Sequence, residues 1–208
     1  MTAARYFYRP EDGHGLAHDP FNAIIAPRPI GWVSTINARG QVNLAPYSFF
    51  NAFNYRPPII GFSSIGFKDS VNNARETGEF CWNLVTRSQV EAMNQTSAAV
   101  SSDTDEFELA GLDKLESTIV AVPHVAGCPV VMECKTSQIV QLQSARGDKC
   151  ETWLVLGEVV GVHIHESLIE DGTYQTLKAE PVMRGGGPSD YFGISEANRF
   201  QISRPEVA

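Results

Sequence analysis

Hydroxyl groups, one cation and one carboxylate gather in a short stretch after an apolar run. Residues 59–62 are apolar, and the polar group that follows comprises Ser63, Ser64, Lys68, Asp69 and Ser70. The start of a helix offers unpaired N–H groups and a partial positive charge, so hydroxyls and a lysine placed there suit an anion such as a phosphate. The stretch predicts a phosphate-binding loop, although a capped helix beside a solvated lysine fits the local spacing equally well.

A second feature lies upstream, in residues 43–53, "NLAPYSFFNAF". Tyr47, Phe49, Phe50 and Phe53 stand there among small and amide-bearing residues. A flat heteroaromatic ligand needs an apolar or aromatic wall and a few hydrogen bonds at its edge, which such a stretch can provide. An aromatic-rich core strand is the alternative. Neither GxxxxGK[ST] nor GxGxxG occurs, so specificity for a nucleotide must come from such a second feature.

The remaining polar groups predict little chemistry. No G-x-S-x-G elbow or Ser/His/Asp set is identifiable, which disfavours a hydrolase. His163 and His165 share one face of a strand, but two histidines without a third ligand nearby indicate a polar strand face rather than a metal site. We interpret the acidic residues Asp103, Asp105 and Glu106 as a solvated loop.

Composition narrows the class of protein. With 208 residues and 43% hydrophobic residues, the chain suits one compact domain. A formal net charge of -8 argues against nucleic acid or an anionic membrane as partner. No apolar run reaches the roughly 18 residues of a membrane span, and the charged N-terminus is unlike a signal peptide, so we expect a cytoplasmic protein. The four cysteines form no CxxC pair, which favours reduced structural thiols over zinc ligands.

Elements of mainly β type must position these groups. Residues 30–53 alternate as a hairpin with its turn at residues 37–41, and a further strand should begin near Ile59. Asp69 and Ser70 are good caps for a short helix that ends at Gly78, and a strand over residues 79–85 follows.

Another helix and two long strands are predicted further along the chain. Ser88 and Glu91 form a capping-box pattern, and the helix that follows should turn Val90 and Met93 to the core. Residues 130–143 alternate with a break near Ser137 and Gln138, as at a β-bulge, and residues 151–169 alternate over a longer span that includes Gly157 and Gly161. Long coiled strands without βαβ alternation predict an antiparallel barrel with helices attached.

Four motifs, in order, resemble the flavin reductase-like family of the FMN-binding split barrel fold. They are "RPIGWVSTINARGQVNLAPYSFFNAFNYRPPIIGFSS", "KDSVNNARETGEFCWNLV", "LGEVVGVHIHESLIEDG" and "PVMRGGGPSDYF". The resemblance implies a six-stranded antiparallel split barrel of Greek-key type that forms one domain over residues 1–208, with about 20 peripheral residues at each end. It also implies a homodimer that binds FMN at the subunit interface.

The same resemblance assigns site residues. The flavin ring would contact Ala45, Pro46, Tyr47, Ser48, Phe49 and Asn51, with Trp32, Ser34 and Thr35 approaching from the neighbouring strand. The phosphate would be held in the loop that contains Ser63, Ser64, Lys68, Asp69 and Ser70. Arg184 and Tyr191, in the glycine-rich segment, would close the pocket.

The reaction implied is the reduction of flavin by NADH or NADPH, with reduced flavin passed to an oxygenase partner. Hydride passes directly between the two rings, so the protein needs to stack and orient them and needs no catalytic acid or base. This agrees with a sequence in which no such group is identifiable. Two alternatives stay open: a non-catalytic FMN-binding or electron-carrier protein, and a reductase or oxidase of another small substrate on the same fold.

Overall fold

Seven antiparallel strands form the main sheet of the computed structural model, which describes residues 4–205. They are β2 (Gly31–Ile36), β3 (Val42–Tyr47), β4 (Phe50–Tyr55), β5 (Pro58–Ile65), β6 (Glu79–Asn83), β9 (Val130–Gln143) and β10 (Lys149–Ile164). Their order across the sheet is β3-β2-β6-β9-β10-β5-β4. The two outermost strands, β3 and β4, are joined by only two residues, so the sheet must curl until its edges approach each other.

This architecture confirms the prediction of a mainly β antiparallel barrel and corrects its strand count from six to seven. The extra strand arises within residues 43–53, which form β3 and β4 instead of one continuous strand. The chain bends at Ser48 and Phe49, between the two. Ser48 and Phe49 therefore lie where the two edges of the sheet come together.

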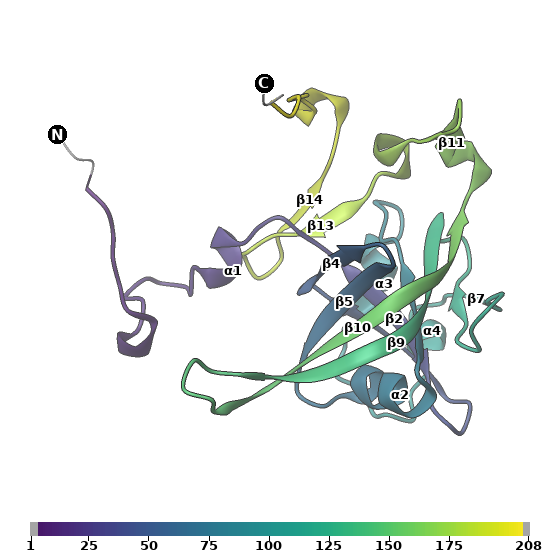
Figure 1. The fold of residues 1–208 in the computed structure, drawn as a ribbon, viewed down its shortest axis with the longest axis horizontal. Coiled ribbons are helices and arrows are strands. Elements are labelled where there is room, and N and C mark those ends of the chain that lie inside the picture. Colours follow the sequence, from purple (N-terminus) through teal and green to yellow (C-terminus); the bar gives the residue numbers. More distant parts are fainter. Residues whose placement is uncertain (1–3, 206–208) are drawn as a thin grey trace.

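Shorter elements surround the barrel (Figure 1). The helices are α1 (Phe21–Ile24), α2 (Asp69–Thr77), α3 (Val90–Gln95) and α4 (Glu106–Leu109), with 3-10 turns at Pro10–Asp12, Glu166–Leu168, Thr176–Ala179 and Glu196–Asn198. A three-stranded sheet joins β1 (Arg28–Pro29), β13 (Val182–Arg184) and β14 (Tyr191–Gly193). Two small ribbons pair β7 (Lys114–Leu115) with β8 (His124–Val125) and β11 (Ile169–Glu170) with β12 (Thr173–Tyr174). Figure 1 shows the N-terminal segment leading away from the barrel and α2 lying against one end of it.

The barrel interior is filled by aromatic and branched side chains. Phe62 and Phe80 are fully buried and meet edge to face with ring centroids 5.6 Å apart. A Cβ atom on Gly157 would lie 2.3 Å from Cε1 of Phe80. Gly157 thus gives the long strand β10 room to pass the Phe80 ring, which explains a glycine in the middle of a strand.

Two sequence patterns were interpreted correctly. The bulge predicted near Ser137 is present: Leu156 pairs with Gln138 and Gly157 pairs with Thr136, which leaves Ser137 without a partner. Val90 and Met93 of α3 are buried in the core, as predicted.

The predicted helix caps were wrong in detail. Helix α2 ends at Gly78 in the left-handed conformation as expected, but it begins at Asp69 with Lys68 as the N-cap, so Asp69 and Ser70 belong to its first turn.

No helix among residues 4–205 is both long and apolar enough to cross a membrane.

The capping box of α3 does not form either. The helix begins at Val90, after the N-cap Gln89, and this cap makes no side-chain hydrogen bond. The Ser88 hydroxyl instead lies 3.0 Å from that of Thr86. The Ser88 hydroxyl, which the sequence pattern assigned to the helix cap, therefore bonds the Thr86 hydroxyl instead.

Candidate functional site

A cavity of about 340 Å³ opens between β3, the start of α2 and the segment after α3. Its lining includes six residues that the sequence predicted for the site: Ala45, Pro46, Tyr47, Lys68, Asp69 and Ser70. The structure thus brings together part of the aromatic stretch and part of the polar loop. Asn43, Thr96, Ser97, Ala98, Ala99, Val100 and Glu106 complete the lining.

The polar end of the cavity is the beginning of α2. Lys68 is extended, and its carbonyl accepts hydrogen bonds from the N–H groups of Val71 and Asn72, 3.0 Å each. The earlier N–H groups, of Asp69 and Ser70, have no carbonyl within the helix to bond because they belong to its first turn. Gly66 has φ of 88°, which favours glycine and lets the chain turn from β5 into the helix.

A buried network fixes the Ser70 side chain. The Asn43 side-chain amide donates to the Ser70 hydroxyl at 2.8 Å, and both residues are buried. Burial raises the pKa of the Tyr47 hydroxyl, while hydrogen bonding to Ser70 and Ser64 partly opposes the rise. The Ser64 hydroxyl also donates to the Gly66 carbonyl at 2.9 Å. Ser64 and Ser70 therefore hold Tyr47 and the turn in place from inside the protein.

The predicted residues of β2 lie behind the cavity wall. Trp32 is fully buried, and its indole N–H donates to the Thr96 hydroxyl at 3.0 Å. The Thr35 hydroxyl accepts from the Asn73 amide of α2 at 3.1 Å. Ser34 is buried, and its hydroxyl accepts from the Asn83 side-chain amide at 3.4 Å. Trp32 and Thr35 thus position two walls of the cavity without lining it.

A second cavity, of about 270 Å³, adjoins the first. It contains three further predicted residues, Ser48, Arg184 and Tyr191, and it shares Pro46 and Ser97 with the first cavity. The Arg184 guanidinium donates to the carbonyls of Pro188 and Asp190, at 2.9 and 2.7 Å, and lies 5.0 Å from the centroid of the Tyr191 ring. Arg184 therefore shapes the glycine-rich segment beside this second cavity.

The structure does not bring Phe49, Asn51 or Ser63 into either cavity lining. The Ser63 N–H donates to the Phe49 carbonyl at 2.8 Å, and Ser63 pairs with Leu154 on the face opposite to the buried Phe62. Asn51 borders a separate, mostly apolar cavity of about 330 Å³.

Sequence reasoning missed Asn43, residues 96–100 and Glu106. The interpretation of Glu106 as part of a solvated loop was wrong: the residue is only 7% exposed, and its carboxylate accepts from the Leu44 N–H at 3.0 Å. Asp105 caps α4 by accepting from the N–H of Phe107, and this cap turns Glu106 towards β3. Neither this cap nor the contact with Leu44 was predicted from the sequence.

The electrostatics of the cavity centre on Glu106. Burial raises the pKa of its carboxyl, the Leu44 N–H partly opposes that rise, and the charges of Asp69 and Asp105 add to it. Lys68 is the cation among the lining residues. The cavity wall thus combines one ammonium group with two carboxyl groups.

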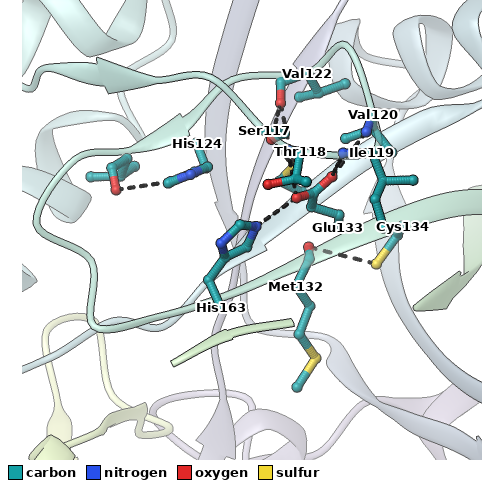
Figure 2. Close-up of polar contacts among 12 residues, drawn as sticks. Ser117, Thr118, Ile119, Val120, Val122, His124, Met132, Glu133, Cys134 and His163 are labelled. Atoms are coloured by element: carbon teal, nitrogen blue, oxygen red, sulfur yellow. Dashed lines mark hydrogen bonds and ion pairs between the residues drawn. The ribbon is translucent and has the colours of Figure 1, made fainter. Parts of the chain in front are cut away.

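His163 belongs to a buried carboxylate cluster outside the cavity (Figure 2). Its Nε2 lies 2.5 Å from Oε1 of the fully buried Glu133, whose carboxylate also accepts from the N–H groups of residues 118–120. The centroid of the His124 ring lies 5.3 Å from that of the His163 ring. His165 instead hydrogen-bonds Ser167. No group of three metal-ligand side chains occurs among residues 4–205, and Glu133 acts here as an anchor for a loop.

All four cysteines are free thiols: Cys81 and Cys134 are buried, and Cys128 and Cys150 are partly buried. Burial raises the pKa of Cys81 and of Cys128 to about 12, so both remain protonated near neutral pH. This agrees with structural roles.

Fold and site together define an antiparallel β-barrel protein with a cavity between β3 and the start of α2. Residues 25–180 match the family model described as the flavin reductase like domain, and the chain belongs to this family. The predicted family and the predicted split barrel are therefore confirmed. Membership makes the chain a flavin-related oxidoreductase.

Relatives agree over most of the length. An uncharacterized protein of Halalkalibacterium halodurans is 34% identical over 88% of each chain. The crystal structure of nitrilotriacetate monooxygenase component B from Bacillus cereus is 31% identical, covers 97% of this chain and 100% of its own, and superimposes with a TM-score of 0.86. The 2-nitrobenzoate 2-nitroreductase of Pseudomonas fluorescens is 28% identical, with coverage of 89% and 88% and a TM-score of 0.77.

Proposed function

We propose that this protein binds FMN in the first cavity and reduces flavin with NADH or NADPH. The observation that carries the proposal is the composition of that cavity. Lys68 and the start of α2 stand at one end, and the apolar segment of residues 45–47 forms a wall. An isoalloxazine needs such a wall, and a phosphate needs such an end.

The residues present fit the cofactor. A volume of about 340 Å³ lies within the range of about 300–1,000 Å³ that is usual for small-molecule sites. Helix α2 has nine residues, enough for a full set of first-turn donors. The second cavity adjoins the first and offers room beside it for the part of a ligand that extends past Pro46.

When bound, FMN would supply the ring that accepts the hydride. Lys68 and the N–H groups of Asp69 and Ser70 would hold its phosphate as charge-assisted donors. Residues 45–47 would orient the ring and exclude water from one of its faces. The hydrogen bond from Asn43 would keep Ser70 in place during turnover. No protein acid or base takes part in this scheme, because hydride transfer needs orientation rather than proton transfer.

A homodimer is part of the proposal. Ile65 on β5 and Val140 and Leu142 on β9, the two strands that flank β10, face outwards, and the first two residues are 66% and 41% exposed. Phe53, on the edge strand β4, is 52% exposed. Contiguous apolar surface of this kind is usually covered by a partner, most often by a second copy around a twofold axis. Sedimentation should give twice the chain mass, and Val140→Glu should shift it towards the monomer.

The fate of the reduced flavin is also proposed. One similar structure is the B component of a monooxygenase, which supports transfer of reduced flavin to an oxygenase partner. A nitroreductase is similar at 28% identity, and the second cavity would suit a small organic acceptor, which makes direct reduction of such a substrate the second candidate function.

Steady-state turnover separates these functions. The purified protein should oxidise NADH or NADPH rapidly once free FMN is added. Oxidation that needs a nitroaromatic acceptor as well as bound FMN would favour the second candidate. A protein that binds FMN and leaves both nicotinamides unoxidised would be a carrier, and the reductase proposal would be wrong.

A further inference from the structure

The charges around the first cavity oppose the ligand proposed for it. Lys68 contributes one positive charge, whereas Asp69 and Glu106 contribute two negative charges when both are ionised. A phosphate monoester is close to a dianion near neutral pH, because its second pKa is about 6. A dianion would therefore enter a cavity whose ionised lining is already negative.

Glu106 is the group able to remove this conflict. The residue is only 7% exposed, so its charge is poorly solvated, and burial raises the pKa of its carboxyl. Asp69, in the first turn of α2, is half-buried and therefore less buried than Glu106. Protonation of one carboxyl therefore falls on Glu106, which would leave the lining neutral.

Among the residues that the structure describes, no cation on the elements packed against Glu106 forms an ion pair with it. Strand β3 contributes the Tyr47 hydroxyl, α2 contributes Asp69, and the turn before α4 contributes Asp105. Residues 96–100 carry no ionisable side chain. Lys114 is paired with Asp105, and Lys68 precedes α2 at the cavity itself.

We propose that Glu106 couples the binding of a phosphate-bearing flavin to the uptake of one proton. The inference rests on the proposed function. The protonated carboxyl can still accept from the Leu44 N–H with one oxygen, and it can donate with the other. Glu106 is thereby a specificity residue: it penalises the phosphate of FMN at high pH and leaves riboflavin, which has no phosphate, unaffected.

Glutamine at this position reproduces the protonated state. Its carbonyl oxygen can accept from the Leu44 N–H, its amide can donate, and it carries no charge. The test is the dissociation constant of FMN and of riboflavin for the wild type and Glu106→Gln, measured from flavin fluorescence between pH 5 and 8. Glu108→Gln is the matched control, because Glu108 lies on the same helix and is exposed.

For FMN, the ratio of the wild-type constant to that of Glu106→Gln should rise with pH, by at most about tenfold per pH unit. The phosphate's own titration cancels in this ratio. The same ratio measured with riboflavin should not rise with pH. The ratio of the wild-type constant for FMN to that of Glu108→Gln should not rise either. A ratio for FMN that is independent of pH would overturn the inference and leave the proposed function intact, whereas absence of FMN binding by the wild type would overturn both.

A second measurement covers the case in which Glu106→Gln does not fold. In wild-type protein with 13C-labelled glutamate carboxyls, FMN at pH 6 to 7 should move one buried carboxyl resonance towards its protonated position, and riboflavin should not. Unchanged carboxyl resonances on FMN binding would contradict the inference.

Discussion

The Asn43 side-chain amide donates a 2.8 Å hydrogen bond to the Ser70 hydroxyl, and this bond joins β3 to the first turn of α2. The two residues belong to the aromatic stretch and to the polar loop, which are the two sequence features that carry the proposed site. Both residues are buried, so the bond is little exposed to solvent. The bond therefore joins the cavity wall on β3 and the anion end at the start of α2 into one structural unit.

Ser70→Ala tests this unit. The substitution leaves the buried Asn43 amide without its partner, which should lower the free energy of unfolding by about 1–3 kcal/mol. Urea unfolding of the apoprotein measures it, with the exposed Ser102→Ala as control. Equal stability of the two variants would show that Asn43 finds another partner.

Lys68→Ala tests the anion end. A charge-assisted hydrogen bond contributes about 1.5–3 kcal/mol, so FMN should bind roughly 10- to 100-fold more weakly while riboflavin changes little. Flavin fluorescence gives both constants, and Lys178→Ala, remote in a 3-10 turn and paired with Glu170, is the control. Equal weakening of both ligands would mean that Lys68 does not contact the phosphate.

The Glu133 cluster predicts acid sensitivity. Burial alone would raise the pKa of Glu133, but hydrogen bonds from His163 and from the N–H groups of residues 118–120 lower it to about 2. A lowered pKa stabilises the fold above the ordinary value of 4.5, and this contribution, about 3 kcal/mol, is lost as pH falls from about 5 to about 2.

Glu133→Gln should therefore be less stable than the wild type at pH 7, and the gap should narrow as the pH is lowered towards 3. Urea unfolding at several pH values measures this, and the exposed Glu116→Gln should follow the wild type throughout. A gap that stays constant with pH would contradict the assignment of the lowered pKa.

Gly157→Ala tests the packing inside the barrel. The added methyl group would meet the Phe80 ring at 2.3 Å, which should cost about 1–3 kcal/mol of stability. Gly193→Ala is the matched control, because a Cβ there meets nothing within 4 Å. The second substitution Phe80→Leu should recover part of the loss in Gly157→Ala. Thermal unfolding that is unchanged by Gly157→Ala would mean that Phe80 moves aside freely.

Local patterns in the sequence predicted local structure well. The bulge at Ser137 was visible because a strand has a period of two and one extra residue breaks it. The turn that separates β3 from β4 was missed because Ser48 and Phe49 include neither glycine nor proline. The α3 cap was misassigned because Thr86, just outside the pattern, competes for Ser88.

Cavity-lining residues were predicted where they lie close together in the sequence and missed where they do not. Lys68, Asp69 and Ser70 are consecutive, and they line one cavity with residues 45–47. Glu106 reaches Leu44 across 62 positions, and nothing local marks an acid for burial. The family resemblance assigned Trp32 and Thr35 to the ligand, and in the structure both hydrogen-bond residues of the cavity walls from behind.

A crystal structure of the protein grown with FMN would show whether FMN occupies the cavity between β3 and α2. Density for the phosphate should lie within hydrogen-bond reach of the Lys68 ammonium and the first turn of α2, with the isoalloxazine against residues 45–47. Flavin density elsewhere on the barrel, or a phosphate remote from Lys68, would contradict this placement.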